Sequence, residues 1–281
     1  YIENIFKNCG LETSVQEYRT ANCDPEDFDA VLEIEGKNFT LGEDFSPAYI
    51  SYENSVEGVA TFDIHDEFLE KKILVTDSLI GLGDRRPLGV LIKSDEIIKY
   101  MTVYQKSMPM FCISEEVYGQ IKAGETIKMT LNSVLELKNC RNIVGKIKGK
   151  DGSQAVVVSA HYDGCGFDKT GEYKSAVDNA SGVVSMIETI KAFKAENGSQ
   201  SPECDIVFAA FDGEEQGLTG SNYFLNHLEY EKVWNINIDC VGKNGNVLVC
   251  YHGENEMFAQ EISSYLIGSE VCEGGGISDD I

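Results

Sequence analysis

The sequence predicts an α/β fold, a mixed sheet flanked by helices on both faces, with a small β-rich domain inserted into it. From about residue 139, apolar strand-like runs alternate with segments of helical periodicity, which is typical of a sheet covered by helices. Between about residues 28 and 132, short strand-like runs follow one another with few helical patterns, which indicates a separate β-rich unit. The hydrophobic content of 42% is sufficient for a packed core.

The first part of the chain is predicted to begin with an amphipathic helix and a polar loop within residues 1–20. The clearest strand candidates that follow are 31–34, 58–64, 73–76, 88–93 and 126–131. Residues 95–104 are compatible with a short helix. We therefore expect residues 38–132 to form the inserted domain, between a starting segment at 1–37 and the main domain at 133–281.

The second part of the chain is predicted to alternate between strand and helix. Strands are expected at 155–159, 205–211, 233–239 and 246–251, and helices at 179–195, 221–228 and 257–267. The longest helix has the most regular pattern, because Val183, Ile187 and Ile190 recur at helical spacing.

Composition narrows the classes of partner and compartment. The formal net charge of −24 argues against a nucleic-acid partner, because an acidic surface repels phosphate backbones. No apolar run approaches the length of a membrane span. The nine cysteines are scattered without a CxxC pair, which slightly favours a reducing compartment. Because the chain begins at Tyr1 without an initiator Met, we expect a processed piece of a longer protein, and removal of an upstream signal would leave the localisation open.

Acidic and imidazole side chains gather at the ends of the predicted strands and just before the long helix. They are His161, Asp163, Asp178, Glu214, Glu215 and Asp239. Because active sites of α/β folds collect at the carboxyl ends of strands, these groups are expected to converge. His, Asp and Glu are the ligands of hydrolytic zinc sites. A carboxylate can also bridge two metal ions, and a further Glu can serve as a base.

Each of these groups has a simpler structural interpretation when it is taken alone. A His-x-Asp pair at a strand end is more often a polar cap, and Asp178 or Asn179 could cap the helix without any metal. Paired glutamates in a loop are usually solvated, and Asp239 could mark the end of a strand. The order in which the groups follow one another favours the metal site over these alternatives.

Taken in that order, the residues resemble the motifs of the co-catalytic zinc aminopeptidases, metallopeptidase family 28, which includes aminopeptidase Y and the glutamate carboxypeptidases. The matching stretches are His161-Tyr162-Asp163, Asp178-Asn179-Ala180-Ser181-Gly182, Glu214-Glu215-Gln216-Gly217-Leu218, Gly220-Ser221 and Asn237-Ile238-Asp239. The resemblance covers about residues 140–281 and implies a zinc-exopeptidase fold, whose catalytic domain would combine 1–37 with 133–281. The β-rich insert resembles, in architecture alone, the protease-associated domain of many members.

The resemblance implies a centre of two co-catalytic Zn2+ ions. His161 would bind one ion, and Asp239 would complete that site. Asp178 would bridge the two ions, and Glu215 would bind the other one. Manganese or cobalt would also suit such a set of ligands.

The resemblance also implies the catalytic roles. Asp163 would orient the imidazole of His161 and raise its basicity. Glu214 would be the general base, which takes a proton from a metal-bridging water and passes it to the leaving amine. The metals would lower the pKa of that water and polarise the scissile carbonyl. The implied enzyme is an aminopeptidase, a hydrolase acting on peptide substrates with a free N-terminus.

The resemblance is incomplete at the fifth metal ligand, which in the family is a His near the C-terminus. The chain ends at Ile281 without it, and Asp280 stands where the family tends to have a His after Ser-Asp. Of the other histidines, His65 and His227 are expected on the surface, and His252 is a conceivable substitute. Either the chain is truncated at the C-terminus or the protein has lost one metal site, and in both cases it could hold one Zn2+ and be inactive.

Alternative functions stay open at this point. A glutamate-carboxypeptidase-like or glutaminyl-cyclase-like enzyme would use the same scaffold, but the carboxypeptidase would want a cationic pocket for the terminal carboxylate. The arginines are Arg19, Arg85, Arg86 and Arg141, and none lies in the matched motifs. A non-catalytic binding relative of the same fold is the remaining alternative.

Overall fold

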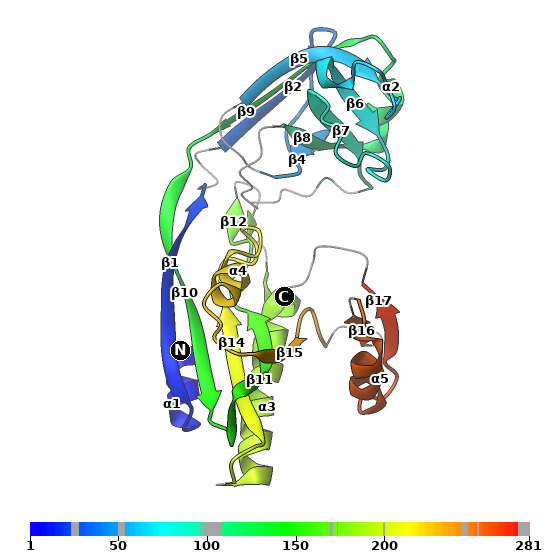
Figure 1. Ribbon diagram of the computed structural model, residues 1–281. Coiled ribbons are helices and arrows are strands. Elements are labelled where there is room, and N and C mark those ends of the chain that lie inside the picture. Colours follow the sequence, from blue (N-terminus) through cyan, green and yellow to red (C-terminus); the bar gives the residue numbers. More distant parts are fainter. Residues whose placement is uncertain are drawn as a thin grey trace.

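The computed structural model describes residues 1–23, 28–49, 54–95, 97, 108–168, 171–172, 174–198, 200–242, 247–251 and 253–274. Its two large sheets form separate lobes of the molecule (Figure 1). The lower lobe in Figure 1 is a five-stranded sheet with helices packed against it, and the upper lobe is an eight-stranded sheet. The α/β class that the sequence predicts is confirmed.

The five-stranded sheet has the strand order β1-β10-β14-β11-β15. Its strands are β1 (Glu12–Asn22), β10 (Glu136–Ile147), β14 (Cys204–Phe211), β11 (Asp151–His161) and β15 (Lys232–Asn237). β11 runs parallel to both β14 and β15, whereas β10 is antiparallel to β14 and to β1. The sheet is therefore mixed, as predicted, and its parallel strands end at the same edge.

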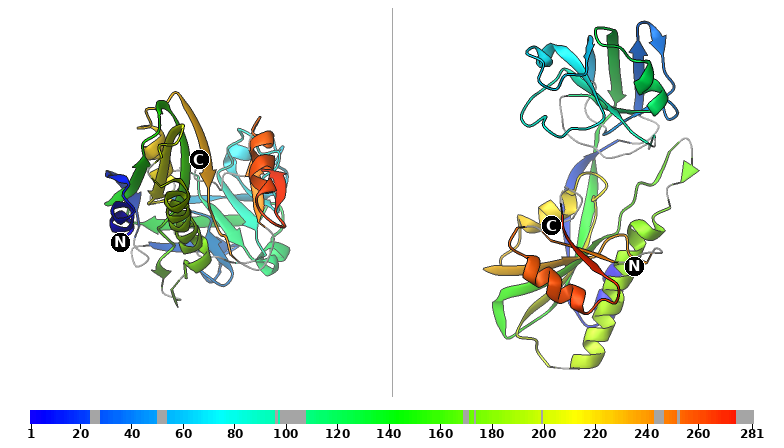
Figure 2. Two further views of the ribbon diagram at one scale, coloured as in Figure 1. Left: turned by 90° about the horizontal axis from the view of Figure 1, so that it is seen from below. Right: turned by 90° about the vertical axis from the view of Figure 1, so that its right-hand side faces the viewer.

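Helices cover both faces of this sheet (Figure 2). On one face lie α1 (Ile2–Asn8) and α3 (Ser181–Asn197), from which Phe6 and Met186 enter a buried cluster with Phe208. On the other face lies α4 (Thr219–Leu225), whose Phe224 packs against Phe211 with ring centroids 5.3 Å apart.

The central strands serve both faces because of their side-chain pattern. Almost all of the second half of β11 and most of β14 is apolar, and successive side chains of a strand point to opposite sides of the sheet. Ala160 and Phe208 therefore join the cluster formed with α3, whereas Val157 and Phe211 join the cluster formed with α4. Nearly continuous apolar runs of this kind are typical of parallel strands buried on both faces.

The eight-stranded sheet has the order β3-β2-β9-β5-β6-β7-β8-β4. Its strands are β2 (Phe28–Ile34), β3 (Lys37–Asn38), β4 (Phe45–Pro47), β5 (Asn54–Thr61), β6 (Lys72–Thr76), β7 (Gly89–Lys93), β8 (Met110–Ile113) and β9 (Thr126–Ser133). A short 3-10 helix, Leu69–Lys71, and α2 (Glu115–Gln120) accompany them. The sheet has its own core, which includes Leu32, Phe111 and Ile127. The expected boundaries at 37/38 and 132/133 and the protease-associated character of this unit stay predictions.

Smaller elements complete the chain. β12 (Phe167–Asp168) and β13 (Gly171–Glu172) form a short hairpin between β11 and α3. β16 (Leu248–Tyr251), α5 (Glu256–Ser264) and β17 (Glu270–Glu273) form a βαβ unit that stands apart from the five-stranded sheet in Figure 1 and in the left view of Figure 2. Among the described helices, none has both the length and the apolar character that crossing a bilayer would need.

The N-terminal segment differs from its sequence prediction. α1 ends at Asn8, and residues 12–20, which the sequence suggested were part of a polar loop, belong to β1. This strand pairs with β10 along its whole length at the edge of the sheet, and Tyr18 is its one buried side chain. A polar edge strand carries little apolar alternation, so its pairing cannot be seen from pattern alone. The helix expected at 95–104 falls almost wholly outside the described residues.

Gly149, between β10 and β11, lies against the backbone at the start of β14, and this contact can be tested by substitution. Its N–H donates to Asp205 Oδ1 over 2.8 Å, and a Cβ at this position would lie 2.2 Å from the carbonyl carbon of Cys204. Because the obstructing atoms belong to backbone, Gly149→Ala is expected to lower the free energy of unfolding by about 1–3 kcal/mol. Urea denaturation measures this free energy. Gly152→Ala is the control, since a Cβ there meets nothing within 4 Å, and equal effects of the two substitutions would contradict this account.

Candidate metal centre

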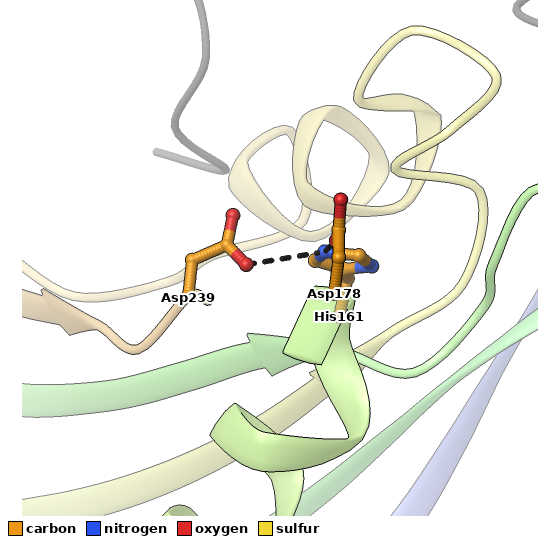
Figure 3. Close-up of side chains that lie close together, drawn as sticks. All are labelled: His161, Asp178 and Asp239. Atoms are coloured by element: carbon orange, nitrogen blue, oxygen red, sulfur yellow. Dashed lines mark ion pairs between the residues drawn. The ribbon is translucent and has the colours of Figure 1, made fainter. Parts of the chain in front are cut away.

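His161 is the last residue of β11, and its side chain is completely buried at 0% exposure. Two carboxylates approach the same ring nitrogen, because Nε2 lies 3.1 Å from Asp178 Oδ1 and 3.5 Å from Asp239 Oδ1 (Figure 3). One ligand atom from each of these residues lies within 4.8 Å of the other two. We call His161, Asp178 and Asp239 the ligand cluster.

The topology of the sheet explains why the ligand cluster forms. β11 and β15 are parallel neighbours, and Ser159 pairs with Asn237, so His161 and Asp239 emerge together just beyond that pair. Asp178 belongs to the helical turn Ala176–Ala180, which leads into α3 on one face of the same sheet. The predicted convergence at the carboxyl edge of the strands is therefore observed for these side chains.

Unsatisfied polar atoms show what the ligand cluster lacks. Both ring nitrogens of His161 and Oδ1 of Asp239 are buried and have no hydrogen-bond partner within the described structure. Buried polar atoms are nearly always satisfied, so Nε2 of His161 and Oδ1 of Asp239, which lie 3.5 Å apart without a hydrogen bond, point to a bound species between them. An imidazole nitrogen and carboxylate oxygens are donors that zinc accepts. The residues present therefore fit a divalent cation such as zinc.

The local charges also favour a cation. Burial on its own lowers the pKa of His161, but the carboxylates of Asp163 and Asp239 and the charge of Glu214 raise it to about 11. Burial raises the pKa of Asp239, and the neighbouring His161 more than offsets this, so that the pKa lies below its ordinary value. Without a metal, the imidazole therefore carries a proton among negative charges.

Asp163 connects the imidazole to the predicted Glu214-Glu215 pair. Its Oδ1 lies 3.6 Å from Nδ1 of His161, on the opposite side of the ring from the ligand cluster. The same carboxylate accepts the backbone N–H groups of Glu214 and Glu215, over 3.1 and 3.2 Å. Asp163 is therefore placed to orient the imidazole and to hold the turn that follows β14.

Glu215 lies beside the ligand cluster but is not part of it. Its side chain is nearly buried, and burial raises the pKa of its carboxyl, while the neighbouring Cys165 side chain opposes part of that rise. The charges of Asp178 and His161 also act on this carboxyl. Of the four metal ligands that the sequence resemblance implies, the described geometry thus gathers three and leaves Glu215 next to them.

Asn179 is a positioning residue that the sequence interpretation treated only as a possible helix cap. Its carboxamide is completely buried, and the peptide bond before it is cis. Oδ1 accepts the N–H of Gly182 over 2.9 Å and the N–H of Cys240 over 3.2 Å, and Nδ2 donates to the carbonyl oxygen of Ile238 over 2.9 Å. One side chain thus joins the turn that carries Asp178 to the segment that carries Asp239.

Gly182 allows this close approach. A Cβ at Gly182 would lie 2.2 Å from the carbonyl oxygen of Ile238 and 2.4 Å from Oδ1 of Asn179. A larger residue would therefore separate α3 from the segment after β15. This close packing explains why a glycine ends the Asp178–Gly182 motif.

Comparison with known proteins adds the family. Residues 142–269 match the model for "Peptidase family M28", and the stretch contains the whole ligand cluster. This stretch is therefore similar to the peptidase domain that the family model describes. The match agrees with the resemblance that the motifs carry.

This half of the chain is also similar to proteins of named activity. It is 30% identical over 128 residues to a glutamate carboxypeptidase 2 homolog of Caenorhabditis elegans, covering 43% of this chain and 16% of the relative. It is 33% identical over 130 residues to aminopeptidase YwaD of Bacillus subtilis (strain 168), covering 42% of this chain and 27% of the relative. The matched region thus spans less than a third of either relative.

The fold extends the similarity beyond the matched stretch. The zinc aminopeptidase BSAP from Bacillus subtilis superposes with a TM-score of 0.64 at 19% sequence identity. The superposition covers 99% of this chain and 73% of the bacterial enzyme, so the arrangement of both lobes is shared with a solved structure. This comparison establishes the zinc-aminopeptidase type of fold that the motifs implied.

The structure places two of the three other histidines. His65 and His227 are exposed, as expected, and the ring of His227 stacks on Tyr223 with centroids 4.1 Å apart. His252 and Asp280 lie outside the described residues. The identity of a fifth ligand therefore stays a prediction.

Zinc binding is expected to release protons. Because the pKa of His161 is raised to about 11, its imidazole is protonated in the metal-free chain at neutral pH, and a metal must displace that proton. Raising the pH favours the metal-binding form, so the apparent zinc affinity should increase by about tenfold per unit between about pH 6 and pH 8. Titration calorimetry in buffers of different ionisation enthalpy measures the released proton, and binding without proton release would refute the proposed protonation state.

Asn179→Ala is expected to weaken zinc binding by about 10–100-fold, because the buried carboxamide fixes the separation of Asp178 and Asp239. Equilibrium dialysis against a zinc buffer measures the affinity. Asn226→Ala is the matched control, since that amide is exposed and bonds within its own helix turn. Equal zinc affinities for the two variants would show that Asn179 does not position the ligands.

Proposed function

We propose that this chain carries the core of a metal-dependent exopeptidase, an aminopeptidase that hydrolyses N-terminal residues of peptides. The observation that supports it is the ligand cluster, which lies at the carboxyl edge of parallel strands inside the stretch that matches the family M28 model. The names of similar proteins, among them aminopeptidase YwaD and a probable zinc metalloprotease of Pyrenophora tritici-repentis, agree with this proposal.

In this proposal His161 and Asp239 would hold one zinc ion, and Asp178 would contribute to that site and to a second. Glu215 would serve the second site, because its carboxyl lies close enough for the charge of Asp178 to raise its pKa. Asp178 is suited to a shared role, since its side chain is 55% exposed while its Oδ1 reaches His161. Its other oxygen is therefore open to a second ligand site.

The residues around this centre have distinct parts in peptide hydrolysis. Zinc would lower the pKa of a bound water and polarise the scissile carbonyl. Glu214 would accept a proton from the attacking water and deliver it to the leaving amine. Asp163 would hold the imidazole of His161 and the backbone of Glu214 in a fixed relation, since it contacts both.

The end of the peptide that is cleaved follows from the charges. The centre is rich in carboxylates, and such negative surroundings suit the free amine of a substrate better than a terminal carboxylate. A carboxypeptidase would need a cation for the terminal carboxylate. Arg19 lies on β1, and Arg85 lies in the other lobe, where its guanidinium bonds the carbonyls of Ile64 and Asp66. Arg141 is nearer, on β10, but its hydrogen bonds to Asp212 and Tyr162 are made by its backbone, and its side chain is exposed. An aminopeptidase is therefore favoured over a glutamate-carboxypeptidase-like enzyme.

Glu214→Gln provides the sharpest test of catalysis. The zinc content, measured by elemental analysis, should be nearly unchanged, because Glu214 is not a proposed ligand. Turnover of an aminoacyl anilide should fall by about 100–10,000-fold, because the general base is lost. Glu196→Gln is the control, since Glu196 is exposed on α3. An active Glu214→Gln enzyme would refute the role.

The same assay separates the alternative functions. An aminopeptidase should cleave the free aminoacyl anilide and leave its N-acetyl form intact, because the amine is part of recognition. Cleavage of N-blocked peptides at their C-terminus would instead favour the carboxypeptidase. Zinc binding with no hydrolysis of any peptide would favour a non-catalytic binding relative.

A further inference from the structure

Two cysteines face each other in the βαβ unit formed by β16, α5 and β17. β16 and β17 are parallel and pair with each other in a two-stranded sheet, with Cys250 directly opposite Cys272. The two Sγ atoms lie 3.3 Å apart. Cys250 is exposed and Cys272 is half-buried, so the pair is accessible from solvent.

The backbone places these residues at the right separation for a covalent bond. Neighbouring strands lie about 4.8 Å apart, and disulfides join Cα atoms that are about 4.4–6.8 Å apart. Opposite residues of paired strands fall inside this range, and both side chains already point toward each other. Bond formation therefore requires side-chain rotation rather than movement of the strands.

Among the described residues, the sheet that carries the pair has only two strands. A two-stranded sheet is at best marginally stable in water. This unit also exposes large apolar side chains, with Leu248 61% exposed, Met257 84% exposed and Ile267 fully exposed. A bond between the strands would restrict the unfolded ensemble of the unit, because it would close a loop that contains all of α5.

We propose that Cys250 and Cys272 are a modification site, at which a reversible disulfide ties β16 to β17 and stabilises the βαβ unit. The oxidant is a low-molecular-weight disulfide such as oxidised glutathione. The thiolate of one cysteine attacks the glutathione disulfide, forming a mixed disulfide and releasing one glutathione thiolate. The thiolate of the other cysteine then displaces the second glutathione, so that two protein thiols are oxidised and one glutathione disulfide is reduced to two thiols.

Two of the other cysteines, Cys23 and Cys140, compete poorly for this reaction. Cys23 is 2% exposed, and burial raises the pKa of Cys140 to about 11. A buried thiol that keeps its proton is a weak nucleophile. The site therefore depends on the exposure of the Cys250 and Cys272 pair together with their register.

The experiment equilibrates the purified chain with glutathione buffers of increasing oxidised fraction, traps remaining thiols with N-ethylmaleimide and identifies linked peptides by mass spectrometry. The expected result is a peptide pair joining Cys250 to Cys272 that grows with the oxidised fraction and disappears with dithiothreitol. Hydrogen exchange of the β16 and β17 amides should slow severalfold on oxidation.

Substitution by serine supplies the controls, since it changes one sulfur to oxygen. In Cys272→Ser, Cys250 should stop at the mixed disulfide with glutathione, and hydrogen exchange in β16 should not slow. Cys204→Ser, on β14, should behave like the unchanged chain. The proposal is overturned if both cysteines of the unchanged chain remain free thiols, which N-ethylmaleimide then alkylates, or if each ends as a separate glutathione adduct. It is also overturned if the amides of the linked form exchange hydrogen as fast as those of the reduced form. None of these readouts depends on peptidase activity.

Discussion

Parallel pairing between β11 and its neighbours decides where the chemistry of this chain can lie. Because β11, β14 and β15 run in one direction, the segments that follow them leave the sheet at one edge. His161 ends the first strand, the Glu214-Glu215 turn follows the second, and Asp239 follows the third. The apolar runs that bury β11 and β14, together with the pairing of β15 to β11, thus also bring the polar groups together. The site is a consequence of burial elsewhere in the sheet.

The same arrangement creates an electrostatic problem. A fully buried imidazole stands among carboxylates, and its nitrogens and one carboxylate oxygen have no hydrogen-bond partner in the described structure. Desolvation of this kind is costly unless an opposite charge compensates it. In the metal-free chain a proton on His161 provides part of the compensation, as its raised pKa indicates. A divalent ion would compensate more of the negative charge, so metal binding and the stability of this edge are expected to be linked.

The sequence allowed prediction of the parts of this site that depend on local pattern. His161, Asp178 and Asp239 could be placed together because each adjoins a strand or helix whose apolar periodicity is plain. Asn179 could not be assigned its full role, because two of its partners lie 59 and 61 residues away. β1 was missed for a related reason, since a polar edge strand is defined by its pairing with β10 rather than by its own residues.

The missed edge pair also bears on the catalytic turn. From β1, the hydroxyl of Tyr18 donates to the carbonyl oxygen of Asp212, and on β10 the N–H of Arg141 donates to Oδ2 of the same residue over 2.9 Å. The hydroxyl of Tyr162, next to His161, donates to the carbonyl oxygen of Arg141 over 2.6 Å. The chain enters and leaves the eight-stranded sheet through these same two strands (Figure 1). A displacement of that lobe would therefore act first on the strands that brace Asp212, two residues before Glu214. The lobe of the eight-stranded sheet is thus joined, through β1 and β10, to the residue that lies two positions before the proposed general base.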